Sequence, residues 1–442
     1  MRYQLSDHFT LGRLLRFTMP SIFMMVFTSL YSVVDGFFVS NFAGKTPFTA
    51  VNFIMPFLMV LGSAGFMFGT GGSALIARTL GEGDAPRARQ QFSLVVYAAL
   101  LTGVVLAVLG QLALRPFAAF LGAEGQLLKD SVTYGRINLA ALPTFILQFA
   151  FQCLFATAGK PTLGLTITVA AGVTNMVLDA LLVAVVPGGL VGAAIATALS
   201  QCVGGLLPLL YFARPNSSLL RLGRTRFSHR VLLQTCLNGS SELMSNISAS
   251  LVGMLYNAQL LRYAGEDGVA AYGVLMYVSM IFQAVFIGYS VGSSPIVSYH
   301  YGAAHPAALR GLLRRGAGII GGFSLMMLGL ALTLAGPLSR LFVGYDEALT
   351  QLTIRAFSIF AWSFLFSGFA IFGSSFFTAL NDGPVSAAIA FLRTLVFQLA
   401  AVLLLPLVWG VDGIWLSTVA AEVLAVAVTL VLLAVKQRKY GY

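Results

Sequence analysis

Long apolar stretches separated by short polar segments make up most of this sequence. Stretches such as Leu94–Leu112, Leu163–Val186 and Ile414–Val435 carry very few charges, and each approaches the roughly 20 residues that an α-helix needs to cross a bilayer. A transmembrane barrel would instead alternate polar and apolar residues in segments of roughly ten. These stretches are continuous and rich in Leu, Ala and Gly, so they predict an all-α polytopic membrane protein.

The polar breaks divide the chain into twelve predicted transmembrane helices. They cover residues 17–40, 48–77, 91–112, 133–157, 162–186, 190–212, 231–261, 269–299, 312–335, 352–379, 385–408 and 413–435. An even number of spans places both termini on the same side of the membrane. Pro20, Pro143 and Pro295 fall within these helices, where proline can introduce a kink.

Charge is scarce and unevenly distributed. Only 9% of the residues are charged and 58% are hydrophobic, whereas soluble domains are about 25% charged. Of the 26 Lys and Arg residues, eighteen fall at the two termini or in loops on the same side of the membrane as the termini. Six fall in loops on the opposite side. The positive-inside rule therefore predicts cytoplasmic termini. It also explains the net charge of +11 without a nucleic-acid partner.

The second half of the chain repeats the first at an offset of 221 residues. Gly44–Arg89 aligns with Gly265–Arg310 without a gap, and the same offset pairs Gly192 with Gly413. Six helices per repeat predict two pseudo-symmetric bundles related by an axis along the membrane normal. The expected division is an N-lobe at 1–212 with helices 1–6, a cytoplasmic linker at 213–230, and a C-lobe at 231–442 with helices 7–12.

Acidic side chains inside the predicted helices are the strongest functional candidates, because ionisable groups are costly in a bilayer. In the first half these are Asp35 and Asp179. Asn175 shares a helical face with Asp179, since the two are four residues apart, and Thr197 lies on the next helix. Two carboxylates, an amide oxygen and a hydroxyl could hold a small cation such as Na⁺. The two acids could equally share protons.

Glu242 and Glu422 are the buried acids of the second half. Neither has an acid at the equivalent position of the first half, where Ser21 and Gln201 stand. Glu242 could bind a cationic substrate or a proton, or it could pair with Arg393 as a structural ion pair. Glu422 and Arg393 are also candidates for substrate binding. The remaining candidates are polar residues of predicted helices that could face a cavity: Asn246, Gln148, Gln152 and Gln283.

Several short segments resemble the multidrug and toxic compound extrusion (MATE) family. They are LYSVVDGFFV around Asp35, TAVNFIMP at 49–56, RTLGEGDAPRAR at 78–89 and SSPIVSYHYGA at 293–303. VDGIWLSTVAAE at 411–422 is similar to the last helix of the bacterial MepA-like branch. The resemblance covers the whole chain and its twelve-helix, two-lobe plan.

The resemblance implies a monomeric antiporter of the bacterial cytoplasmic membrane, surrounded by lipid, that exports organic cations or drugs in exchange for Na⁺ or H⁺. It also implies an N-lobe cation site, matched here by Asp35, Asn175, Asp179 and Thr197. Some branches place a further acid within helix ten. Residues 352–379 contain none, and Asp382 lies beyond them, so we expect coupling in the N-lobe.

Two other functions would leave different features in the sequence. A lipid or glycan flippase of the same superfamily would carry more buried basic residues for anionic headgroups, whereas buried acids predominate here. A membrane-embedded enzyme would need metal-ligand or nucleophile motifs, and the sequence has neither these nor a P-loop. The prediction is therefore a transporter without a cofactor, powered by an ion gradient.

Overall fold

The computed structural model describes residues 4–442, except for the side chain of Lys45, and all elements in that range are helical. The α-helices are α1 (Leu11–Phe38), α2 (Lys45–Gly81), α3 (Ala85–Phe120), α4 (Gly125–Ala140), α5 (Leu142–Thr157), α6 (Pro161–Asp179), α7 (Gly189–Ala213), α8 (His229–Gly302), α9 (Pro306–Val343), α10 (Glu347–Phe360), α11 (Ser363–Ala379), α12 (Gly383–Phe391), α13 (Phe397–Leu404), α14 (Pro406–Trp409) and α15 (Val411–Tyr440). Three π-helical segments are η1 (Val39–Ala43), η2 (Ala180–Val185) and η3 (Leu392–Val396).

These elements form the twelve predicted spans. Within the described residues, nine helical stretches are long and apolar enough to cross a membrane, and the bent pairs α4–α5 (59°) and α10–α11 (46°) raise the number to eleven. The long helix α8 supplies the twelfth, because its backbone breaks at Gly265 (φ 66°, ψ −156°). The α4–α5 bend lies directly before Pro143, one of the predicted kinks.

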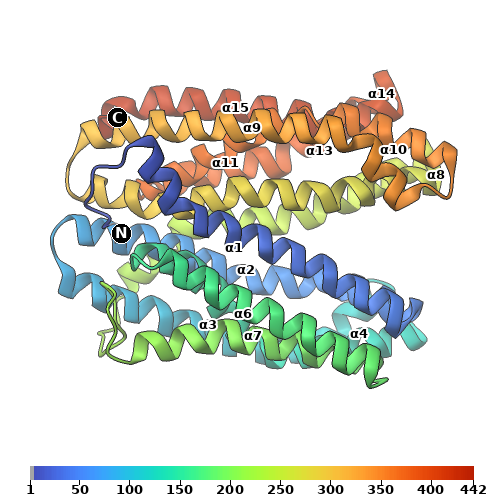
Figure 1. Ribbon diagram of the computed structural model, residues 1–442, viewed down its shortest axis with the longest axis horizontal. Helices are drawn as coiled ribbons and strands as arrows, with labels where there is room; N and C mark the ends of the chain where they lie inside the picture. The colour runs from blue at the N-terminus through green and yellow to red at the C-terminus, as the bar shows by residue number, and fades with distance from the viewer. Residues whose placement is uncertain (1–3) are drawn as a thin grey trace.

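Two helical bundles form the molecule, as Figure 1 shows. Helices α1–α7, blue to green, make one bundle, and α8–α15, yellow to red, make the other. Both termini and the α7–α8 connection lie at the same end (Figure 1), which agrees with an even number of spans. The bundles approach each other at that end, and their ribbons spread apart at the opposite end.

The backbone preserves the sequence repeat. Gly44 (φ 104°) and Gly265 (φ 66°) are repeat equivalents, and both mark the break between the first two spans of their half. Gly189 (φ 53°) and Gly410 (φ 58°), also 221 residues apart, both stand at the start of the last span of their half. Positive φ favours glycine because it lacks a Cβ, so each half keeps the same two glycine-dependent turns.

Glycine also allows the two bundles to touch near the termini. A Cβ added at Gly81 would lie 2.0 Å from the Tyr299 carbonyl oxygen, and one at Gly302 would lie 2.0 Å from the Arg78 carbonyl oxygen. These are equivalent contacts, because Arg78 and Tyr299 are themselves repeat equivalents. The Arg78 guanidinium additionally lies over the Tyr301 ring, 5.3 Å from its centroid. Close packing of backbone on backbone therefore holds the bundles together at this end.

The connection between α7 and α8 is fastened to the first bundle. The Gly223 amide donates to the Ser93 hydroxyl (3.0 Å), and the Thr225 hydroxyl donates to the Gln90 carbonyl oxygen (2.9 Å). The Arg89 side chain donates to the Leu219 carbonyl oxygen (3.2 Å). The connecting segment is therefore packed along α3.

The C-terminal residues are anchored to the second bundle. The Tyr440 hydroxyl donates to the Asp382 carboxylate at 2.5 Å, and Lys436 and Lys439 lie 3.7 and 3.6 Å from the same carboxylate oxygen. Burial, followed by the charge of Asp382, raises the pKa of Tyr442 to about 12. Asp382, which lies between α11 and α12, therefore anchors the C-terminal residues.

Candidate functional site

Asp35 lies at the centre of a polar cluster in the first bundle. Its side chain lies close to those of Asp179, Asn175 and Thr197. Asp179 and Asn175 are 0% and 1% exposed. The cluster joins α1, α6 and α7, and α6 gives way to the π-helical η2 directly after Asp179. The structure thus brings together all four residues predicted to form a cation site.

The oxygens of this cluster lack hydrogen-bond donors. Asp35 Oδ1, Asn175 Oδ1 and both carboxylate oxygens of Asp179 are buried and accept no hydrogen bond from the described residues. Among the described residues, no Lys or Arg side chain forms an ion pair with Asp35 or Asp179. Two adjacent carboxyl groups in this setting need a shared proton or a bound cation. The donor set of hard oxygens fits either one.

Two tyrosines that the sequence analysis did not consider border the cluster. Tyr134 on α4 is fully buried, lies near Thr197 and is close enough to both acids to interact electrostatically with them. Tyr31 lies four residues before Asp35, on the same face of α1, and its hydroxyl is close to Gln148. The four-residue spacing could have identified Tyr31. Tyr134 comes from a distant helix and has no comparable signal.

A separate cavity of about 580 Å³ lies mainly in the second bundle, within the usual range of roughly 300–1,000 Å³ for small-molecule sites. Its wall is rich in hydroxyl and amide groups, and only Glu242, Arg393 and Glu422 carry charge. Tyr256 and Tyr272 add a stacked aromatic pair with centroids 5.4 Å apart. The first bundle contributes Thr70, Ser73 and Cys153.

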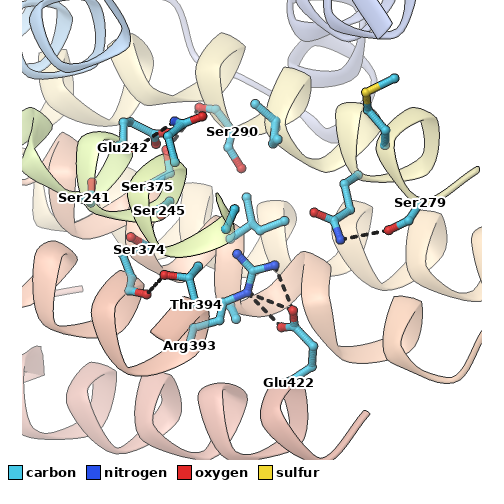
Figure 2. Close-up of a pocket in the computed structure, with 18 of the residues that line it drawn as sticks. Ser241, Glu242, Ser245, Ser279, Ser290, Ser374, Ser375, Arg393, Thr394 and Glu422 are labelled. Atoms are coloured by element: carbon cyan, nitrogen blue, oxygen red, sulfur yellow. Dashed lines mark hydrogen bonds and ion pairs between the residues drawn. The ribbon is translucent and has the colours of Figure 1, made fainter. Parts of the chain in front are cut away.

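Arg393 forms its ion pair with Glu422, so the suggested Glu242–Arg393 pair is wrong. Arg393 Nε and Nη2 make three hydrogen bonds of 2.8–3.1 Å to the Glu422 carboxylate, drawn as dashed lines in Figure 2. The side chains are only 14% and 3% exposed. Arg393 lies on η3, and π-helical turns change which face of a helix a side chain occupies, often at functional sites.

Glu242 is left as the uncompensated charge of the cavity. It lies apart from the Arg393–Glu422 pair in Figure 2, with Ser241, Ser245 and Ser375 nearby. Its carboxylate forms no ion pair or hydrogen bond with the described residues, although it is close enough to interact electrostatically with Arg393. With all three groups ionised, the wall has a net charge of −1. This arrangement favours a cationic guest.

The four neutral candidates divide between the bundles. Asn246 and Gln283 line the cavity, where Gln283 donates to the Ser279 hydroxyl at 3.2 Å. Gln148 and Gln152 are 3% and 2% exposed and lie on α5 in the first bundle. A role for these two glutamines in substrate binding stays a prediction.

A duplicated twelve-helix bundle with buried acids in one half and a charged cavity in the other defines a membrane transporter. The chain belongs to the MatE family, whose sequence model matches residues 20–181 and again 243–404, one segment in each bundle. The chain is therefore a multi-pass transporter rather than an enzyme.

Curated relatives and solved structures agree with this assignment. The multidrug export protein MepA of Staphylococcus saprophyticus is 22% identical over 427 residues, covering 96% of this chain and 94% of MepA. MepA of Staphylococcus aureus is 21% identical over 428 residues, with the same coverage. An outward-facing multidrug resistance MATE family transporter of the MOP superfamily superposes with a TM-score of 0.92 at 21% identity, covering 97% of this chain and 96% of that one. These similarities establish the fold.

Proposed function

We propose that this protein is a secondary active antiporter that exports organic cations in exchange for Na⁺ or H⁺. The observation that carries the proposal is the separation of two acidic sites between the bundles. The cluster around Asp35 has unsatisfied oxygens and, among the described residues, no ion pair with a Lys or Arg. The cavity around Glu242 is large enough for a drug-sized molecule. One site suits a small coupling cation, and the other suits a larger organic one.

Alternating access gives these sites a mechanism. Binding of Na⁺ or H⁺ at Asp35 and Asp179 neutralises a cluster that is otherwise costly within a bilayer. Such binding would shift the relative stability of conformations only if the cation binds one of them more tightly. The contacts of Gly81 and Gly302 close the end that holds the termini, which supports a conformation open at the other end. With cytoplasmic termini in the bacterial inner membrane, that conformation faces outward.

The test is transport of a fluorescent organic cation in proteoliposomes, with Na⁺ and pH gradients imposed separately. Wild-type protein should move the cation against its gradient under one of them. Asp35→Asn, which fixes this side chain as neutral, should abolish coupled transport. Asp267→Asn removes an exposed acid and should transport normally, which controls for expression and reconstitution.

Two results would contradict the proposal. Full coupled transport by well-reconstituted Asp35→Asn protein would remove the cluster from the coupling step. Movement of labelled lipid between leaflets, with no transport of the organic cation under either gradient, would establish the flippase alternative.

A further inference from the structure

A groove with a strongly basic wall lies outside both acidic sites, at the end that holds the termini. It measures about 560 Å³ and is lined by Leu11, Ala307, Arg310, Gly311, Arg314, Arg315 and Gly318. All of these except Leu11 come from the first four turns of α9. Their spacing of three and four residues places them on one helical face, with small residues between the arginines.

The three arginines are close in sequence and lack acidic partners. No ion pair forms between Arg310, Arg314 or Arg315 and a carboxylate of the described residues. Arg315 Nη1 donates to the Phe9 carbonyl oxygen at 2.7 Å. The side chains of Arg310 and Arg314 are exposed. Like charges four residues apart on a helix repel each other, so an anion in the groove would stabilise this arrangement.

The other wall is held in place by the N-terminal segment. Leu5 and Phe9 are buried (1% and 2% exposed), and the Arg315–Phe9 hydrogen bond ties this segment to α9. Leu11 follows at the start of α1 and is 54% exposed. The groove therefore combines three arginines with an apolar lining of Leu11, Ala307, Gly311 and Gly318.

We infer that this groove binds the headgroup phosphate of an anionic phospholipid of the inner leaflet. Arg310 and Arg314 supply charge-assisted hydrogen bonds to phosphate oxygens, a geometry that guanidinium groups match well. The acyl chain lies over Gly318 and against Leu11. Basic pockets beside transmembrane helices on the cytoplasmic side are suited to such headgroups. The inference is independent of the transported substrate and of the coupling ion.

The experiment counts lipids bound to the intact protein by native mass spectrometry, after release from nanodiscs of phosphatidylcholine with or without phosphatidylglycerol. Phosphatidylglycerol should be retained by wild-type protein, and Arg310→Gln/Arg314→Gln should weaken retention at least about tenfold. Arg221→Gln/Arg224→Gln is the matched control, because it removes two exposed loop arginines expected on the same side. It should retain the lipid as wild type does.

A steric variant separates a lipid from a free anion. A Cβ at Gly318 would meet no atom within 4 Å, so Gly318→Leu should fold normally while filling the apolar part of the groove. It should lose phosphatidylglycerol with all arginines intact. Equal loss in the loop control would reduce the effect to bulk charge and overturn the inference. Competition by millimolar inorganic phosphate, with Gly318→Leu unaffected, would identify a soluble anion site and also overturn it.

Discussion

The Arg393–Glu422 pair allows a quantitative test of what holds the cavity together. Glu422→Gln keeps the side-chain length but removes the charge that receives three hydrogen bonds of 2.8–3.1 Å. Gln is also the residue at the equivalent position 201, so the helix should accommodate it. The substitution leaves Arg393, only 14% exposed, without its partner. Breaking one side of such a buried pair costs about 3–5 kcal/mol.

Glu242 reduces this cost if its carboxylate moves toward the released guanidinium. The expected loss is therefore at the lower end, about 3 kcal/mol in the free energy of unfolding. The double substitution Arg393→Met/Glu422→Leu removes both charges and should restore most of the stability, because well-packed apolar replacements of buried pairs are often neutral. A double-mutant cycle with the single substitutions then gives the coupling energy.

The assay is thermal unfolding of purified protein in detergent, with the folded fraction followed by size-exclusion chromatography. Asp412→Asn provides the matched control, because it removes one partner of the exposed Arg355–Asp412 pair. Its effect should stay within about 1 kcal/mol. Wild-type stability of Glu422→Gln, in a protein that still transports, would refute the structural role assigned to the pair.

Three further predictions follow from individual contacts. If Na⁺ binds the N-lobe cluster, Asn175→Ala removes a neutral ligand and should abolish Na⁺-dependent transport at fixed pH while H⁺-driven flux persists. If transport by the wild-type protein does not depend on Na⁺, proton antiport is the mechanism that is left. Glu242→Gln removes the uncompensated charge of the cavity. Loss of a charge-assisted contact worth about 1.5–3 kcal/mol should weaken the binding of cationic drugs roughly tenfold or more in competition assays. Equal weakening of the binding of neutral drugs would contradict direct binding by Glu242. Tyr440→Phe removes the 2.5 Å hydrogen bond to buried Asp382 and should cost about 1.5–3 kcal/mol of stability. Tyr442→Phe should cost less, because the Tyr442 hydroxyl donates to a neutral carbonyl oxygen. Equal stability of the two variants would rule out this anchor.

The sequence by itself determined the membrane class, the twelve spans and the two-fold repeat. Each depends on local composition or on a fixed offset, and a bilayer permits few structures for apolar stretches of this length. It also predicted that Asp35, Asn175, Asp179 and Thr197 lie together, because acids within apolar helices are conspicuous and the Asn–Asp spacing defines a helical face. Helix ends were less predictable: α3 continues to Phe120 and α9 begins at Pro306, since helices extend into polar residues beyond the apolar core.

Only the tertiary structure decided which side chains meet. Arg393 and Glu422 are separated by 29 residues, and their pairing depends on how two helices are rotated about their axes. The π-helical turn at Arg393 changes that rotation locally, and no residue pattern signals it. The same reasoning applies to Tyr134 beside the acidic cluster and to Tyr440 at Asp382. Apolarity fixes where a helix crosses the membrane. Packing fixes the direction in which each polar residue points, and with it the division between the acidic cluster of the first bundle and the cavity of the second.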